Sequence, residues 1–352
     1  MARNEHPGLA EPSADPFAER HRPRRREQFQ LLGGRFRFET DSPQLLRIVR
    51  EAYRGLPAHT LRNAGPRFSV RLALTGPHHR IDTQNEPPRI RAVSASGLLC
   101  GAMETASFVA IAPGQSSALV VVPREMLAFP YHVRYEMLEF AVYVLAARKQ
   151  GLVPLHAACV GYDGQGILLL GPSGSGKSTV SLHCLAEGLQ FLAEDSVLVD
   201  PDGMLATGIA NFLHARPDSL KFLDARTRAS LLGGSSIIRR RSGVEKLEID
   251  LRRPRYRLAS QPLRIRAVAF ISARRAGARA LLAPLAQGRL MQRLAATQKY
   301  AAHQPGWARF VRQACRLPAF ELRRGQHPHE AVEALMRVLQ SSPDVVSKRA
   351  AR

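Results

Sequence analysis

The chain has 352 residues, 45% of them hydrophobic, and a formal net charge of +22. This length allows one large domain or two ordinary domains with a substantial core. The arginines behind the charge are spread along most of the chain, and the densest block, residues 239–266, lacks the interleaved aromatic side chains of a single-strand binder. We therefore expect an arginine-rich solvated surface, with a patch for phosphate or an acidic partner as the second interpretation, and no specific nucleic-acid binding.

The four cysteines, at positions 100, 159, 184 and 315, are isolated from one another and form no C-x-x-C pair. This spacing argues against a disulfide framework and a zinc site, and it fits a reducing compartment. The N-terminus has no apolar signal region, and the longest apolar stretch, residues 138–147, is interrupted by Glu139 and too short to span a bilayer. We expect a cytoplasmic protein that does not bind a membrane.

The N-terminal part of the chain predicts a small mixed domain. Residues 1–28, rich in Pro, Arg, Glu and Ala, predict a disordered leader. Residues 29–150 predict an α+β module, because alternation indicates strands at 35–38, 68–74 and 118–122, and apolar spacing indicates helices after Asp41-Ser42-Pro43 and over 135–149. A polar loop is expected over 77–88, and no group of side chains in this module points to chemistry.

The predicted elements of the second domain, residues 151–340, begin with strands at 155–160 and 167–170, joined by a turn through Asp163-Gly164. A helix over 179–187 follows, and Gly188 stands where a C-terminal glycine cap belongs. Further strands are expected at 191–200, 265–271 and 319–322, and helices at 291–296 and 328–339. Residues 341–352 form a basic tail.

One motif of the second domain indicates nucleotide binding. The pattern G-x-x-x-x-G-K-[ST] is that of a loop that wraps phosphates, and here it stands between an apolar strand and a helix, as the loop requires. Its glycines let backbone amides approach the phosphates, the lysine can reach the β and γ oxygens, and the first hydroxyl can join a Mg²⁺ shell. The predicted nucleotide-binding residues are Gly171, Pro172, Ser173, Gly174, Ser175, Gly176, Lys177, Ser178 and Thr179.

Two further features near the loop suggest chemistry. Glu194-Asp195 lies inside a strand-like run, where carboxylates are costly to bury unless they meet a cation or take a proton. A carboxylate pair at the exposed start of a strand is the alternative. His156 lies near the start of the strand before the loop, where it could contact the γ-phosphate or orient a carboxylate, or could simply be a hydrogen-bonded core histidine.

Residues 155–160, 166–178 and 192–197 together resemble the catalytic domain of HPr kinase/phosphorylase, which has H-G-x-x-V, G-V-L-L-x-G-x-S-G-x-G-K-S and A-D-D-x-V in the same order and spacing. The resemblance implies an α/β fold: a P-loop kinase domain of the HPr kinase/phosphoenolpyruvate carboxykinase-like type, here preceded by the smaller α+β domain. It also implies transfer of a γ-phosphoryl group to a hydroxyl. His156 and Glu194 match the family's catalytic histidine and first aspartate, and Asp195 matches the second.

The chain departs from the family pattern near the chemistry. Thr179 stands where the family has Glu, Glu194 replaces an aspartate, and the downstream E-I-R-G-x-G-I signature is missing, with Glu245 and Glu248 as weak candidates in the nearest stretch. HPr itself is therefore not the expected acceptor, and phosphorylase activity is not expected. The resemblance is nearer to relatives that act on free serine or on ribosomally made peptides.

The sequence thus predicts an ATP- and Mg²⁺-dependent kinase that phosphorylates a serine or other hydroxyl on a protein, peptide or small molecule. In this hypothesis Lys177 holds phosphates, Ser178 and Asp195 hold Mg²⁺, Glu194 activates the acceptor and His156 supports the transferred group. The alternative is a nucleotide-binding regulatory protein with little or no transfer activity. The acceptor, the choice between ATP and GTP, and a homo-oligomeric state are left open.

Overall fold

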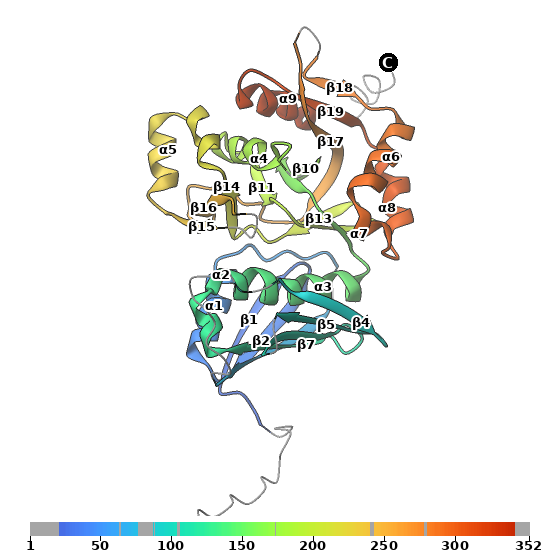
Figure 1. The fold of residues 1–352 in the computed structure, drawn as a ribbon. Helices are drawn as coiled ribbons and strands as arrows, with labels where there is room; N and C mark the ends of the chain where they lie inside the picture. Colours follow the sequence, from blue (N-terminus) through green and yellow to red (C-terminus); the bar gives the residue numbers. More distant parts are fainter. Residues whose placement is uncertain are drawn as a thin grey trace, which may run out of the picture.

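The structure is a computed structural model, and it describes residues 21–62, 65–76, 87, 89–103, 106–172, 174–239, 243–277 and 280–341. Its fold is mixed α/β, with three sheets in the described residues (Figure 1). The predicted leader to residue 20, most of the polar loop at 77–88 and the basic tail beyond Ser341 lie outside these ranges. None of the helices in the described part combines the length and apolar character that crossing a bilayer requires.

The first sheet is mixed and carries the N-terminal part of the chain. β2 pairs in parallel with β3 and β3 with β7, and the remaining pairs are antiparallel. Its first strand begins at Arg25, inside the leader that the sequence predicts for residues 1–28. The strands are, in spatial order, β1 (Arg25–Leu31), β2 (Gly34–Thr40), β3 (Arg67–Thr75), β7 (Ser117–Pro123), β6 (Ser107–Ala112), β5 (Leu98–Met103) and β4 (Arg91–Ala95).

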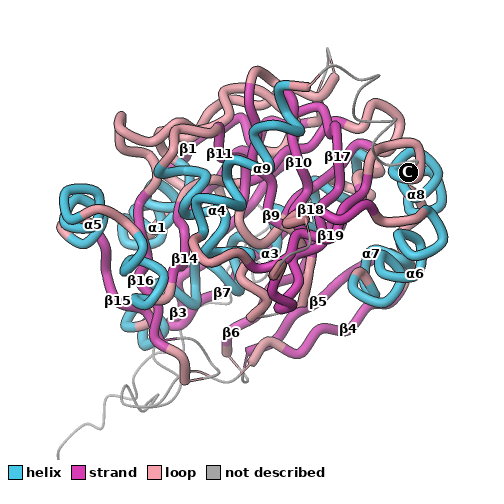
Figure 2. Tube along the Cα trace, turned by 90° about the horizontal axis from the view of Figure 1, so that it is seen from above, coloured by secondary structure: helices cyan, strands magenta, loops and turns pink. Residues whose placement is uncertain are grey.

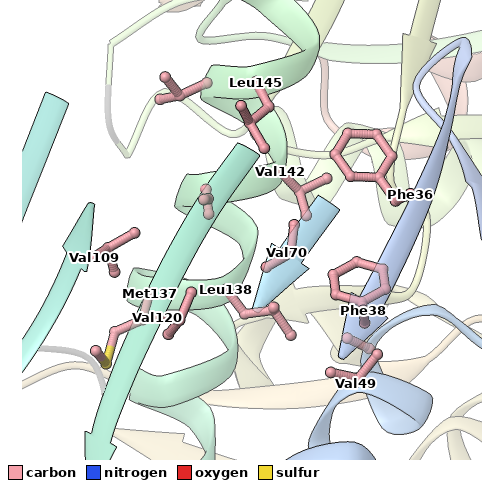
Figure 3. Packing of buried hydrophobic residues seen from close by; sticks show 14 of the residues in the cluster. Phe36, Phe38, Val49, Val70, Val109, Val120, Met137, Leu138, Val142 and Leu145 are labelled. Atoms are coloured by element: carbon pink, nitrogen blue, oxygen red, sulfur yellow. The ribbon is translucent and has the colours of Figure 1, made fainter. Parts of the chain in front are cut away.

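Two helical segments cover one face of this sheet. α1 (Pro43–Tyr53) begins where the sequence predicts, because Ser42 caps it by accepting from the Leu45 N–H at 3.2 Å and Pro43 occupies the first turn. α3 (Glu139–Gln150) follows η1 (Arg124–Ala128), α2 (Pro130–His132) and a π-helical turn, η2 (Val133–Leu138). Alternate strand residues such as Phe36, Phe38 and Val70 pack with Val142 in the core (Figure 3).

The second sheet carries the glycine-rich loop at 171–179. In its centre β10 pairs in parallel with β17, and β17 pairs in parallel with β19. The path through the sheet is β11 (Gln190–Ala193), β9 (Ala158–Tyr162), β10 (Gln165–Leu170), β17 (Leu263–Arg275), β13 (Leu205–Gly208), β12 (Val197–Asp200) and β8 (Val153–Leu155), with β18 (Leu282–Pro284) and β19 (Ala319–Arg324) as a branch.

Helices cover both faces of this sheet, and the middle residues of its central strands are apolar on both faces. Ile167 and Leu169 share a core with the helices α4 (Lys177–Ala186) and α9 (Pro328–Gln340). Leu168 and Leu170 point to the other face. Figure 2 shows α4 and α9 over the strands and the second group of helices to one side. That group is α6 (Gln287–Thr297), α7 (Lys299–Ala302) and α8 (Trp307–Ala314).

A small third sheet lies beside α4 and completes the described fold. It has the order β14 (Phe212–Ala215), β16 (Glu245–Asp250) and β15 (Ser235–Arg239). In the chain, η3 (Pro217–Phe222) and α5 (Ala225–Leu232) lie between β14 and β15. α3 lies between the first sheet and the C-terminal part of the chain (Figure 1). Polar contacts join the two parts there: His59 bonds Thr207 Oγ1 at 2.7 Å and the Ala259 carbonyl at 2.9 Å.

Two of the predicted strands are wrong in one respect. Residues 155–160 and 191–200 each appear apolar enough for one strand, but each forms two, with breaks at His156-Ala157 and at Glu194–Ser196. Apolar residues continue on both sides of each break, so composition alone does not mark it. The breaks contain the three polar residues that the sequence singled out.

Candidate functional site

The glycine-rich loop between β10 and α4 has the backbone shape that its sequence predicts. Gly171, Gly174 and Gly176 have φ values of +149°, +79° and +107°, which residues with a Cβ rarely adopt. A Cβ on Gly171 would also lie 2.8 Å from Ser175 Oγ and 3.0 Å from the Ile271 carbonyl oxygen. Ser173 lies outside the described residues. The loop thus brings its backbone close to the start of α4, where the helix dipole favours an anion.

Lys177 turns back over this loop. Its ammonium donates to the carbonyl of Gly171 at 2.8 Å and of Pro172 at 3.4 Å, and lies 3.4 Å from His156 Nε2. The residue is only 7% exposed, and this burial lowers the pKa of Lys177, while the negative charges of Asp195 and Glu194 oppose the shift. Neutral carbonyl oxygens are weak partners for an ammonium group. The Lys177 ammonium can therefore exchange them for phosphate oxygens.

His156 and the acidic pair meet in the gap between two antiparallel pairings, that of β9 with β11 and that of β8 with β12, and we call this gap the opened ladder. Cys159 pairs with Ala193 on one side of the opening, and Leu155 pairs with Val197 on the other. Both strands therefore advance by four residues across the gap, and the register shifts once beside it, between Phe191 and Ala193. The residues between them leave the ladder together, on neighbouring strands. Openings of this kind free side chains to point at a ligand in place of a pairing partner.

Within the opening, the contacts pair the residues in an order that the sequence did not predict. The sequence assigned Ser178 and Asp195 to the metal. In the structure the Ser178 hydroxyl donates to Glu194 Oε1, and Glu194 Oε2 accepts from the His214 backbone N–H at 2.8 Å. Asp195 Oδ1 instead lies 3.1 Å from His156 Nδ1. Glu194 is thus the carboxylate next to the loop hydroxyl, and the longer side chain spans that distance.

Gln298, at the end of α6, holds His156 in place and was missed by sequence reasoning. Its Oε1 accepts from the His156 N–H at 2.8 Å, and its Nε2 donates to the His156 carbonyl at 3.1 Å. The side chain substitutes for a strand at the position where the ladder is open. Gln298 is 142 residues from His156 in the chain, and no local pattern around it marks this role.

A buried polar chain leads away from Glu194. His214 on β14 lies 3.6 Å from Glu194 through Nδ1 and 3.1 Å from Glu248 Oε1 through Nε2, and Arg134 from η2 donates to the same Glu248 oxygen. Burial raises the pKa of Glu248, but the hydrogen bond from His214 and the charge of Arg134 outweigh it and hold that pKa below its usual range. Of the two weak acidic candidates, Glu248 therefore supports the site indirectly, and Glu245 is exposed.

The loop and the opened ladder line a pocket of about 600 Å³. Thr179, at the pocket wall, bonds through its hydroxyl to Ser219 Oγ at 2.9 Å, so the position where the resembled family has Glu is used to tie α4 to η3. Several basic residues that the sequence did not single out also line this pocket, and they suit a polyanionic ligand. They are Arg216, Lys221, Lys246, Arg323 and Arg324.

The residues fit a nucleotide with its Mg²⁺ ion. Buried Ser175 Oγ, in the loop itself, has no hydrogen-bond partner in the described structure, and a phosphate oxygen would give it one. Within the described ranges no group of three or more His, Cys, Asp or Glu residues could hold a metal by itself. Ser178 and Glu194 supply two oxygen ligands, which suits Mg²⁺ because this ion keeps several waters and takes its other ligands from phosphates.

Comparisons with known proteins yield a distant likeness among solved structures. No family model matches the chain, and no curated protein matches it. Among solved structures, the HPr(Ser) kinase/phosphatase from Coxiella burnetii aligns with 53% of this chain and 87% of its own, at 12% sequence identity and a TM-score of 0.24. The likeness is too loose to support conclusions about this chain, so our proposals rest on the residues of the site.

Proposed function

We propose that the protein is an ATP- and Mg²⁺-dependent kinase that transfers the γ-phosphoryl group to a hydroxyl. The observation that carries this proposal is the opened ladder, which sets Glu194 against Ser178 of the phosphate loop and Asp195 against His156. A loop that only binds nucleotide needs the first carboxylate for its metal and has no use for a second carboxylate with its own histidine. A kinase needs both.

The phosphate side of the site uses the loop and α4. The loop amides and the Lys177 ammonium hold the β and γ phosphates, and the basic pocket lining adds to this field. We assign the metal to Ser178 and Glu194, which exchanges the roles that the sequence suggested for the two carboxylates. When bound, Mg²⁺ neutralises charge that develops on the phosphate oxygens. The His214 N–H fixes Glu194 in the orientation that faces Ser178.

The acceptor side uses Asp195 and His156. The acceptor hydroxyl oxygen bonds to the γ-phosphorus while the bond from that phosphorus to the bridging oxygen breaks, and ADP leaves with the electron pair. The hydroxyl proton passes to the Asp195 carboxylate. His156, held by Gln298, orients Asp195 through the 3.1 Å contact, and its Nε2 lies on the Lys177 side, near the transferred group.

The test is phosphoryl transfer from γ-labelled ATP to acceptors in a cell extract, with nucleotide affinity measured in parallel. Lys177→Ala is expected to lose both binding and transfer. Asp195→Asn is expected to bind nucleotide normally and lose transfer by about 10²- to 10⁴-fold, the usual contribution of a general base. Glu194→Gln is expected to need a higher Mg²⁺ concentration for half-maximal binding.

Asp202→Asn is the matched control, because Asp202 is exposed and pairs only with Arg309 among the contacts described for it outside its own turn. Full transfer by Asp195→Asn would refute its role as the base. Tight, Mg²⁺-dependent nucleotide binding without any labelled acceptor would refute the kinase and favour a nucleotide-binding regulatory protein.

A further inference from the structure

A second pocket shares the acidic pair with the nucleotide pocket. It measures about 460 Å³ and lies between α3 with its preceding turn η2 and the opened ladder. Glu194 and Asp195 line both pockets, so they form the wall between them. A molecule in this second pocket would therefore meet Asp195 from the side away from the nucleotide pocket, where its hydroxyl could pass a proton to that carboxylate.

A third pocket, of about 720 Å³, continues the second along α3. Both are lined by Phe140, Tyr143, Asp195 and Ser196, and we call the two together the α3 groove. The helical residues that line it recur every three or four positions from Glu136 to Ala147, which is one face of a helix. Eleven residues at 1.5 Å each give this face a length of about 16 Å, and an extended peptide of about five residues is equally long.

The two ends of the α3 groove differ in charge. Glu136 joins Asp195 at the η2 end, where the buried Glu194 and Glu139 also line the pocket, and Arg89 is the positively charged residue among the described lining. This acidic end stands out in a chain with a formal charge of +22. Beyond Asp195 the lining is mainly apolar, with Val144, Leu155 and Tyr300 among its residues, and Lys299 adds a positive charge.

We propose that the α3 groove binds an extended segment of a partner protein or peptide, with the hydroxyl residue at Asp195, a basic residue at the Glu136 end and apolar residues toward Tyr300. The proposal rests on the kinase function proposed above and names its substrate class. Length favours a peptide over a metabolite, because the groove extends to both sides of Asp195 and a small molecule would fill one end only. The negative charge at the η2 end selects peptides that carry a basic residue at the matching position.

The experiment uses the full chain, γ-labelled ATP, Mg²⁺ and synthetic nine-residue peptides with a central serine. The flanking positions carry Lys, Glu or Leu on either side. We expect peptides with Lys on one side and Leu on the other to be labelled about tenfold faster than the matched Glu peptides, the ratio that 1.4 kcal/mol of ion pairing produces. Glu136→Lys should reverse this preference, and Glu136→Gln should abolish it.

Glu333→Lys is the matched control, because Glu333 lies on α9, exposed and outside the α3 groove. Its preference should equal that of the unaltered protein, and thermal unfolding of each variant verifies folding. Labelling of a small hydroxyl compound from a cell extract but of no peptide would overturn the groove proposal and leave the kinase standing. Equal labelling of Lys and Glu peptides would overturn the charge assignment, and labelling of this chain alone would replace the partner by autophosphorylation. Nucleotide binding with no labelled product from peptides or extract would overturn the kinase itself.

Discussion

Glu139 provides a sharp test of the interface between the two parts of the chain. It lies on α3 with 6% exposure, and its Oε1 accepts from Asn211 Nδ2 at 2.9 Å. Burial raises the pKa of Glu139 to about 7, against the opposing effects of the Asn211 hydrogen bond and the positive charge of Arg134; the negative charge of Glu248 raises it further. The test variant is Glu139→Gln. Its side chain has the same shape as that of Glu139 and keeps an oxygen that can accept from Asn211, but it has no carboxyl group to ionise.

The sign of the expected effect follows from proton binding. Between pH 4.5 and 7 the folded protein holds the Glu139 proton and the unfolded chain has lost it, so unfolding releases a proton and stability falls as pH rises through this window. A pKa raised from 4.5 to about 7 corresponds to about 3 kcal/mol at 1.36 kcal/mol per pH unit. Glu139→Gln should therefore match the unaltered protein near pH 4.5 and be about 3 kcal/mol more stable at pH 8.

Urea denaturation of both proteins at half-unit steps from pH 5 to pH 8 measures this difference. Glu333→Gln, on the exposed face of α9, controls for the loss of a carboxylate as such. A stability difference between Glu139→Gln and the unaltered protein that stays constant over this range would refute the reasoning, because it would mean that Glu139 ionises normally in the folded state. If the stability advantage of Glu139→Gln became smaller as pH rises, the pKa of Glu139 in the folded protein would be lowered and not raised.

Three further outcomes test the support of the site. Arg134→Met should lower the free energy of unfolding by about 3 to 5 kcal/mol because it leaves Glu248 buried without its cation. In a double-mutant cycle measured by denaturation, adding Glu248→Gln should recover part of this loss, and additive losses would contradict the pairing. Gln298→Ala should reduce the rate of phosphoryl transfer about tenfold at unchanged nucleotide affinity, because a misplaced His156 slows the reaction but does not affect binding. A parallel loss of nucleotide affinity in a titration would argue for a merely structural role. Gly171→Ala should weaken nucleotide binding by about ten- to a hundredfold, the equivalent of about 1–3 kcal/mol of backbone strain. Normal affinity of this variant for a fluorescent nucleotide would show that the loop does not need this conformation.

The sequence by itself determined the glycine-rich loop and its setting between a strand and a helix. The strand at 165–170, the loop and the helix from Lys177 lie where the pattern predicts, and Gly188 has the left-handed conformation expected of a helix cap. Such a loop is predictable because it is formed by consecutive residues, whose backbone geometry follows from glycine positions and from the apolar pattern of the flanking elements.

Only the tertiary structure decided how the polar residues around the loop are paired. Ser178 meets Glu194 and His156 meets Asp195 because the strand pairing is interrupted at a gap that the apolar sequences on either side do not reveal. Gln298 closes that opening from α6, at a sequence separation of 142 residues. The α3 groove depends on the packing of a helix from the N-terminal part against the ladder. These contacts join residues far apart in the chain, and their identity is set by strand register and helix packing, which the local pattern of residues does not contain.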